Sequence, residues 1–245
     1  MRRATAIGLA VLVFLAFSNP AHSDTAKTIA EAGAAAALVG IICSSVALTA
    51  DDEVDPADFA RRGFLVGGAG THAWAVFEDD AEQDFQDQLG GAVQLSVDDS
   101  FGFSGQVGYR CHRHFSAEVE VEWMAGFDGD ITQPGFVQLG TVTYEPVVIT
   151  TNVKGYILTG RYQPFLLLGA GAMTSQMKMG ETTGLTPAQS DSESDVDFVM
   201  RFGGGIDVYA TENWVVNLGV DYVLPFGDLD ALDYVTIKWG FQYRF

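Results

Sequence analysis

The stretch AEVEVEW at residues 117–123 alternates small or apolar side chains with acidic ones without a break. Successive side chains of a β-strand point to opposite faces. One face of this strand therefore carries Glu118, Glu120 and Glu122, and the other face is apolar. In a soluble, half-buried sheet the acidic face would be wet and the apolar face would be core, so the fold class depends on how often the pattern recurs.

Period-two alternation recurs along most of the chain from residue 63 to the C-terminus. The spans are about the 9 to 11 residues that a tilted strand needs to cross a bilayer, and eight strands make the smallest closed membrane barrel. We therefore predict an all-β fold, an eight-stranded antiparallel up-and-down transmembrane β-barrel over residues 62–245. The predicted strands are residues 64–76, 101–110, 117–123, 149–157, 165–173, 198–208, 214–223 and 235–245.

The connections between these strands alternate in length. Short ones are predicted at residues 110–115, 158–163 and 209–213, and long acidic ones follow Phe77, Phe127, Met179 and Leu224. Outer-membrane barrels have short periplasmic turns and longer external loops. With an even number of strands, both ends of the barrel are then expected on the periplasmic side.

The N-terminus has the features of a secretory signal peptide at residues 1–23. Arg2 and Arg3 precede a short apolar run at residues 7–17, and AHS at residues 21–23 resembles a cleavage site. The run is shorter than the roughly 20 apolar residues of a spanning helix. Residues 24–61 form an N-terminal extension, short and helical or irregular. Its apolar stretch at residues 34–48 is compatible with a periplasmic helix, a lumen plug or the core of a longer signal that ends near residue 50.

Charge and cysteine content exclude several classes of protein. The net charge of -19 is far too acidic for a general nucleic-acid binder. Cys43 and Cys111 are too few for a disulfide scaffold, and whether they pair in an oxidising compartment is left open. Ile42 precedes Cys43 where a lipoprotein signal needs a small residue, which argues against lipidation.

Three stretches carry a family resemblance: NVKGYILTGRYQPFLLLGAG at residues 152–171, FVMRFGGGIDVYATENW at 198–214 and IKWGFQYRF at 237–245. With them the barrel segment resembles the small outer-membrane β-barrel family related to outer membrane protein A and the opacity-type surface proteins. The resemblance implies residence in the outer membrane of a Gram-negative bacterium, among outer-membrane lipid and lipopolysaccharide. The C-terminal alternation of Trp239, Phe241, Tyr243 and Phe245 resembles the signal read by the barrel-assembly machinery during biogenesis.

The family resemblance leaves the biochemical task open, because its members differ mainly in their loops and a fold does not fix function. No peptidoglycan-binding domain follows Phe245, so we do not expect the wall-tethering role of outer membrane protein A. Some barrels that resemble this one modify lipid A with a Ser/His/acid set at the outer-leaflet face. His112 and His114 lie at the opposite end on the predicted topology, and His72 has no convincing serine partner.

Other candidate sites have simpler explanations. The glycine clusters at residues 67–70, 169–171 and 203–205 do not stand between a strand and a helix, as a phosphate loop requires, and we expect them to permit bending of the barrel. Cys111, His112 and His114 have metal-ligand side chains, but they crowd one short turn without a fourth ligand. The acidic stretches at 78–87 and 190–197 lack the ordered spacing of a calcium loop. We predict no catalytic residue, no cofactor and no metal.

Inward charges of a narrow barrel are costly unless they are paired and hydrogen-bonded. Counting from the short turns places Arg201, Asp221 and Lys238 at a similar height on three successive strands, with Asp221 between the two cations. Glu118, Glu120 and Glu122 are expected to be flanked by Arg110 on the preceding strand and by Lys154 on the following one. The hypothesis is one neutralising ionic network that fills the lumen, made of Arg110, Glu118, Glu120, Glu122, Lys154, Arg201, Asp221 and Lys238.

The sequence therefore predicts a non-enzymatic outer-membrane barrel with a structural or surface-interaction role and acidic external loops. A narrow porin for small solutes is the alternative, because a barrel of about eight strands is just wide enough for side chains to fill. A lipid A-modifying enzyme is the third hypothesis. The sequence identifies no partner for the loops.

Overall fold

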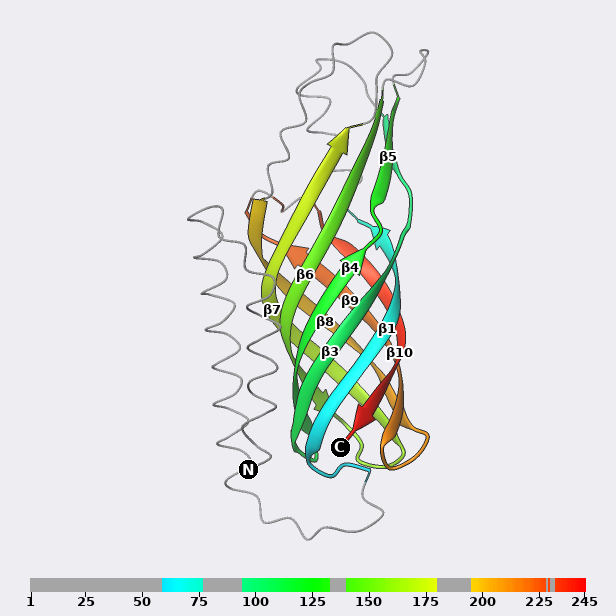
Figure 1. Ribbon diagram of the computed structural model, residues 1–245, viewed down its shortest axis with the longest axis vertical. Helices are drawn as coiled ribbons and strands as arrows, with labels where there is room; N and C mark the ends of the chain where they lie inside the picture. Colours follow the sequence, from blue (N-terminus) through cyan, green and yellow to red (C-terminus); the bar gives the residue numbers. More distant parts are fainter. Residues whose placement is uncertain (1–58, 77–93, 133–139, 180–194, 228, 230–231) are drawn as a thin grey trace.

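The described residues of the chain form a closed antiparallel barrel (Figure 1). The computed structural model describes residues 59–76, 94–132, 140–179, 195–227, 229 and 232–245. The predicted signal, nearly all of the N-terminal extension and the acidic stretch at 78–87 lie outside them. The strands are β1 (Gly63–Ala75), β2 (Gln94–Val97), β3 (Ser100–His112), β4 (Phe115–Met124), β5 (Phe127–Thr132), β6 (Gly140–Tyr156), β7 (Tyr162–Met179), β8 (Asp195–Tyr209), β9 (Trp214–Pro225) and β10 (Tyr234–Arg244).

These ten segments make an eight-stranded barrel. β2 continues β3 and β5 continues β4, since Val97 lies opposite Gly129 in the same register that puts Gly102 opposite Met124. The chain bends before β5 at Gly126, whose φ of 126° is a backbone conformation that favours glycine. Going round the barrel, β1 pairs with β3 and β10, and pairing of β6 with β7 closes the sheet.

The predicted barrel and its eight strands are confirmed, with one error at Phe127. A long connection was expected there, but Phe127 begins β5, which pairs with β6 from Tyr144 to Gly140. Asp128 and Asp130 of this strand point outward and are exposed, whereas Phe127 and Gly129 are buried. Acidic residues that suggest a loop thus occupy the outward positions of a strand that extends the barrel wall.

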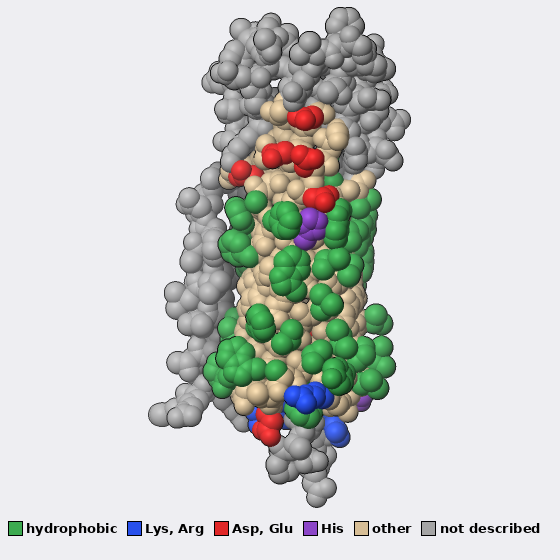
Figure 2. Space-filling model, turned by 90° about the vertical axis from the view of Figure 1, so that its right-hand side faces the viewer, with side chains coloured by type: hydrophobic (Ala, Val, Ile, Leu, Met, Phe, Trp, Pro, Cys, Tyr) green, Lys and Arg blue, Asp and Glu red, His purple; other side chains and the backbone are tan. Residues whose placement is uncertain are grey.

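The outer surface of the barrel carries an apolar belt between two charged ends (Figure 2). We call the end with the connections at 113–114, 157–161 and 210–213 the short-turn end, and the opposite end the long-loop end. Acidic side chains gather toward the long-loop end and Lys or Arg side chains toward the short-turn end. Side chains of the belt include Phe101, Phe103, Leu166, Leu168, Leu218, Trp239 and Phe241, all at least half exposed.

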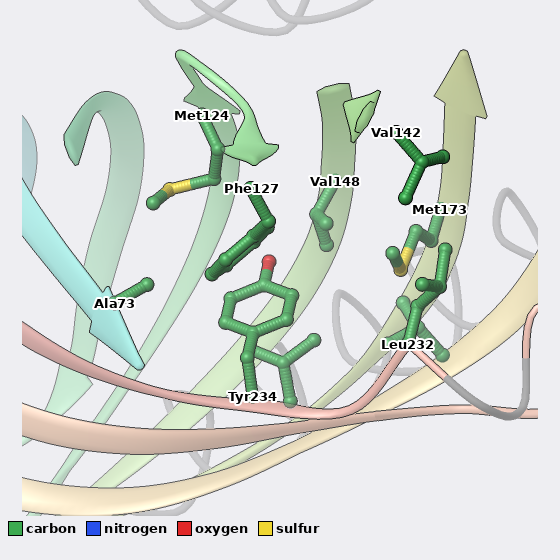
Figure 3. Close-up of a cluster of buried hydrophobic side chains, with 10 residues drawn as sticks. Ala73, Met124, Phe127, Val142, Val148, Met173, Leu232 and Tyr234 are labelled. Atoms are coloured by element: carbon green, nitrogen blue, oxygen red, sulfur yellow. The ribbon is translucent and has the colours of Figure 1, made fainter. Parts of the chain in front are cut away.

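The part of the lumen toward the long-loop end is filled by a buried apolar cluster (Figure 3). The rings of Phe127 and Tyr234 lie side by side there, with centroids 5.5 Å apart and planes tilted by 49°. We call this cluster the apolar layer; its buried members are Ala73, Met124, Phe127, Val142, Val148, Met173, Val199, Val223, Leu232 and Tyr234. Interiors of outer-membrane barrels are usually polar, so an apolar layer across the lumen is a distinctive feature of this chain.

Within the described residues, no helix is long and apolar enough to cross a membrane.

Candidate functional site

The charged side chains of the lumen are buried and balanced. Among the described residues, five acidic and five basic side chains are buried, each at most 7% exposed. The acidic ones are Glu118, Glu120, Glu122, Asp207 and Asp221, and the basic ones are Arg110, Lys154, Arg201, Lys238 and Arg244. The whole chain carries a net charge of -19, so this balance is a property of the lumen and not of the average composition.

Lys238 of β10 contacts three of these carboxylates. Its Nζ lies 2.7 Å from Glu120 Oε1, 2.8 Å from Glu122 Oε2 and 2.9 Å from Asp221 Oδ2. Glu120 and Glu122 come from β4, which is separated from β10 by β1 and β3. The contacts therefore cross the lumen, and the ammonium group uses its three donors on three carboxylates.

Arg201 of β8 contacts the same three carboxylates from the other side. Its Nη1 lies 2.8 Å from Glu120 Oε2, its Nη2 lies 2.9 Å from Glu122 Oε2, and Nη1 lies 3.8 Å from Asp221 Oδ2. Asp221 thus lies between Arg201 and Lys238, as the residue count from the turns predicted. We call Glu120, Glu122, Arg201, Asp221 and Lys238 the five-charge cluster.

Two neutral side chains attach the five-charge cluster to its surroundings. Asn152 donates from Nδ2 to Glu120 Oε2 at 2.9 Å. The Tyr234 hydroxyl donates to Glu122 Oε1 at 3.3 Å, while the Tyr234 ring belongs to the apolar layer. The ionic and apolar parts of the lumen are therefore in direct contact, and the apolar layer covers the cluster on its long-loop side.

A second ionic group lies nearer the short turns. Lys154 Nζ lies 2.9 Å from Glu118 Oε2, and Ser116 Oγ donates to Glu118 Oε1 at 3.0 Å. On the same level, the Tyr156 hydroxyl donates to Asp207 Oδ2 at 2.9 Å. Of the three glutamates of β4, Lys154 therefore pairs with Glu118. Asp207, which was not part of the predicted network, adds a carboxylate at this level of the lumen.

Arg110 does not flank the glutamates as expected. Its Nη1 donates to Gln163 Oε1 at 2.6 Å, its Nε donates to the His112 carbonyl at 3.2 Å, and its guanidinium lies 3.7 Å from the centre of the Tyr156 ring. A further hydrogen bond goes to the Arg113 carbonyl. None of these partners is a carboxylate. Because Arg110 stands at the end of β3, its long side chain reaches the carbonyls of the following turn.

Arg244, like Arg110, lies at the short-turn end of the lumen. Its Nη2 donates to the Glu212 carbonyl at 2.6 Å, and its Nη1 donates to the carbonyl of Phe59. Gln163 Nε2 donates to the same Phe59 carbonyl at 3.2 Å. The segment before β1 is therefore held across the barrel mouth by side chains from β7 and β10.

Inward glycines make room for these side chains. A Cβ atom at Gly203 would lie 2.1 Å from Asp221 Oδ1, and one at Gly169 would lie 2.0 Å from Asn152 Oδ1. The sequence suggested that the glycine clusters allow bending. The structure shows a second reason for two of the clusters, because a larger residue at either position would occupy the space of the network.

A small cavity of about 20 Å³ lies beside the five-charge cluster. Its lining includes Gln106, Asn217 and Lys238. Within the described part of the chain, Gln106 Nε2 and Asn217 Oδ1 are buried without a hydrogen-bond partner. A cavity of more than about 10–15 Å³ with polar partners has room for a water molecule, so the site is suited to one hydrating water and is too small for a solute.

The CHRH turn has the geometry of a structural turn. His114 donates its backbone N–H to His112 Nδ1 at 3.2 Å, and His114 Nδ1 lies 2.9 Å from the Tyr156 carbonyl, to which it must donate. Cys111 is disulfide-bonded, and Cys43, the other cysteine of the chain, lies outside the described residues. No cluster of three metal-ligating side chains occurs in the ranges that the structure describes.

His72 lies on the outer surface near the long-loop end. Its Nε2 is 3.3 Å from Asp99 Oδ2, and its ring lies 4.4 Å from the rings of both Trp74 and Phe101. These contacts include an acid and two aromatic rings but no serine hydroxyl.

The residues of the predicted assembly signal line the outer face of β10. Trp239 is 50%, Phe241 62% and Phe245 66% exposed. Tyr243 packs between Trp214 and Phe245, with ring centroids 5.1 Å and 4.9 Å away. Their recognition by the assembly machinery stays a prediction.

Several residues of the lumen were not included in the predicted network. They are Asp207, Arg244, Tyr156, Gln163 and Tyr234, together with Asn152. The period-two alternation of the strands places most of these residues on the inward face, so their position in the lumen could have been predicted from the sequence. Three of the contacts were not predictable, because Arg110–Gln163, Tyr156–Asp207 and Tyr234–Glu122 join strands that are not neighbours in the sheet.

Comparison with known proteins agrees with this architecture. The family model described as outer membrane protein beta-barrel domain matches residues 9–245. Among solved structures, the chain is similar to Ail of Yersinia pestis, at 17% identity over 75% of this chain and 97% of that chain, with a TM-score of 0.42. It is also similar to OprG of Pseudomonas aeruginosa (16%, 75% and 95%, TM-score 0.45) and to Neisserial surface protein A (12%, 76% and 99%, TM-score 0.47).

No curated protein sequence matches the chain. The family model is that of an outer-membrane barrel domain and indicates no enzymatic family. Because the family model covers almost the whole sequence, the chain belongs to the outer membrane protein beta-barrel domain family, and its place is the outer membrane.

Proposed function

We propose that this protein is a closed outer-membrane barrel that does not conduct solutes and presents its long-loop end as an interaction surface outside the cell. The observation that carries the proposal is the balance of five buried acidic and five buried basic side chains in the described lumen. A pore that selects ions by charge needs an open path lined by charges that are not compensated by their neighbours. Here the charges compensate one another inside the barrel wall.

The energetic argument supports a permanent closure. Removing one member of a buried ion pair costs about 3–5 kcal/mol. In the five-charge cluster Lys238 and Arg201 each contact three carboxylates. A passing solute would have to break several of these contacts at once, and the apolar layer would still block its way toward the long-loop end.

The proposed orientation puts the short-turn end in the periplasm. Its support is the general rule that outer-membrane barrels have short periplasmic turns and longer external loops. β5 and β6 extend the wall at the other end, with exposed Asp128 and Asp130 on the outward face of β5. In this orientation the two aspartates lie at the end of the barrel that faces the outside of the cell.

Single-channel recording in planar bilayers tests the closure. The wild-type protein is expected to give no steady conductance, and so is Lys238→Met, because the apolar layer still closes the lumen when the cation that joins Glu120, Glu122 and Asp221 is removed. Asp128→Asn, a matched charge change outside the lumen, is expected to stay closed. Steady ohmic conductance of the wild-type protein would refute the proposal in favour of the narrow porin.

The orientation has a separate test. A protease site inserted between residues 133 and 139 is expected to be cleaved in intact cells, and one inserted after Thr211 only after the outer membrane is permeabilised. The reverse pattern would show that the short turns face the outside.

A further inference from the structure

The short-turn end presents a basic and apolar surface that the closed lumen does not explain. Two neighbouring turns each place an arginine next to exposed apolar side chains. We call this surface the turn patch; it consists of Arg113, Phe115, Ile157, Leu158, Arg161 and Tyr162.

The two turns of the patch are fixed to each other. β4 pairs with β6, with Phe115 opposite Gly155, so the turn before β4 adjoins the turn after β6. His114 Nδ1 donates to the Tyr156 carbonyl at 2.9 Å, and Tyr156 N donates to the His114 carbonyl at 2.8 Å. Arg113 and Arg161 therefore belong to one continuous surface and not to two independent loops.

Arg161 is held in place while it stays exposed. Its Nε donates to the Tyr209 carbonyl at 2.8 Å and its Nη2 donates to the Ala210 carbonyl at 2.9 Å. Two hydrogen bonds to the next turn fix the guanidinium plane, and Nη1 has no partner among the described residues, so it can donate to an outside acceptor. An ordered arginine loses little conformational freedom when it binds a phosphate, and its geometry suits phosphate oxygens.

The apolar part of the patch places it at a membrane boundary. Ile157 is 63% and Tyr162 61% exposed, and Phe115 is 45% exposed, all immediately beside the cationic turns. Aromatic side chains such as Tyr162 favour the level of the lipid headgroups. The arginines are thus positioned where the phosphate groups of one leaflet lie.

We propose that the turn patch binds the headgroups of anionic phospholipids, with Arg113 and Arg161 on the phosphate, Tyr162 at the level of the headgroup, and Phe115 and Ile157 against the acyl chains. Assignment of these lipids to the periplasmic leaflet rests on the orientation given above; the binding itself does not. A soluble polyanion would match the arginines but not the exposed apolar side chains between them.

Native mass spectrometry of the purified full chain in detergent tests the proposal. Equal amounts of phosphatidylglycerol and phosphatidylcholine with the same acyl chains are added in separate samples. Attraction of one basic residue to an anionic surface corresponds to about a fivefold change in affinity. We expect phosphatidylglycerol to be retained preferentially, and Arg113→Gln and Arg161→Gln each to reduce that preference about fivefold.

Two further variants make the result specific. Arg62→Gln removes a cation of the same end outside the turn patch and is expected to keep the preference. Arg161→Gln also breaks the bonds to Tyr209 and Ala210, so its folding is checked by thermal unfolding, and Arg113→Gln, whose side chain can be lost without breaking these bonds, serves as the second variant. Arg161→Lys is expected to restore part of the preference.

The outcomes separate this inference from the proposed function. Equal retention of both lipids, an equal loss in Arg62→Gln, or displacement of phosphatidylglycerol by purified lipid A from the wild-type protein would overturn it. Because detergent imposes no orientation, preferential binding together with external short turns would refute only the orientation.

Discussion

Lys238 Nζ and Glu120 Oε1 lie 2.7 Å apart although 118 residues separate them in the sequence and two strands separate them around the barrel. The contact forms only when β1 has joined β10, because β1 is the strand that links the N-terminal and C-terminal halves of the wall. The five-charge cluster therefore depends on complete closure of the barrel, and its loss is expected to be felt in global stability.

Lys238→Met should destabilise the barrel strongly. It leaves Glu120, Glu122 and Asp221 with Arg201 alone, so three carboxylates face one cation. Removing one partner of a buried ionic group costs about 3–5 kcal/mol. Urea unfolding in lipid vesicles measures the loss, with Asp128→Asn as a control for a charge change outside the lumen. Equal stability of Lys238→Met and the control would mean that water enters freely and screens the cluster.

Asp221→Asn should cost much less than Lys238→Met. The sequence places Asp221 between Arg201 and Lys238, so that its loss is expected to leave the two cations facing each other with less compensation. The structure gives Glu120 and Glu122 this role as well, and the cluster has three carboxylates for two cations. Neutralising Asp221 balances the charges, so we expect a loss toward the lower end of the roughly 1.5–3 kcal/mol that a hydrogen bond to a charged group contributes.

The double variant Lys238→Met/Asp221→Asn checks this charge count. It has two carboxylates and one arginine, so it should be more stable than Lys238→Met alone. Non-additive effects of this kind are expected between residues in contact. If the two losses simply add, the stability of the cluster depends on individual hydrogen bonds and not on the balance of charge.

The sequence predicted the strands well because period-two alternation is local. Residues 117–123 show their inward face without any knowledge of neighbouring strands, and the same is true of Arg201, Asp221 and Lys238. The partners of Arg110 were not predictable in this way, because its side chain bonds to Gln163 and to carbonyls of its own turn. The apolar layer was also missed, since Met124, Phe127 and Tyr234 lie at strand ends, where alternation is short and resembles a loop.

Heating should change the gel mobility of the protein. Small closed barrels in this family bury their backbone hydrogen bonds in a sheet without edges, and here the lumen is crosslinked by ion pairs as well. We expect faster migration in detergent gels before boiling than after it, in material from the outer-membrane fraction. Lys238→Met should convert to the slower form at a lower temperature. Identical mobility of the boiled and unboiled wild-type protein would argue against a closed barrel.

Deletion of Phe245 should impair assembly and leave export intact. Phe245 is 66% exposed, its ring lies 4.9 Å from the Tyr243 ring, and its N–H donates to the Phe64 carbonyl at 2.9 Å, so its loss removes one terminal hydrogen bond and little side-chain packing. A defect in membrane assembly, with normal removal of the signal peptide and accumulation in the periplasm, would therefore reflect lost recognition by the assembly machinery. Refolding of the same variant from urea into vesicles is the control and should be close to that of the wild-type protein. Normal assembly in cells would mean that the terminal aromatic pattern has no such role.

Gly171→Ala and Gly105→Ala form a matched pair that compares a buried, inward-facing glycine with an exposed, outward-facing one. Both glycines lie within long strands, β7 and β3. A Cβ atom at Gly171 would lie 1.9 Å from the Ile149 carbonyl oxygen and 2.7 Å from Thr150 Cα, both backbone atoms that cannot move alone. At Gly105 no atom lies within 4 Å of an added Cβ. Overpacking at a site of the first kind costs about 1–3 kcal/mol, whereas an alanine in open space reduces the freedom of the unfolded chain and is neutral or stabilising by up to about 1 kcal/mol. The change in the free energy of unfolding relative to the wild-type protein, measured in the same vesicles, should therefore differ in sign or by at least about 1 kcal/mol between the two variants. Equal values would show that β6 and β7 can move apart, and that the close approach at Gly171 does not limit the packing of the lumen.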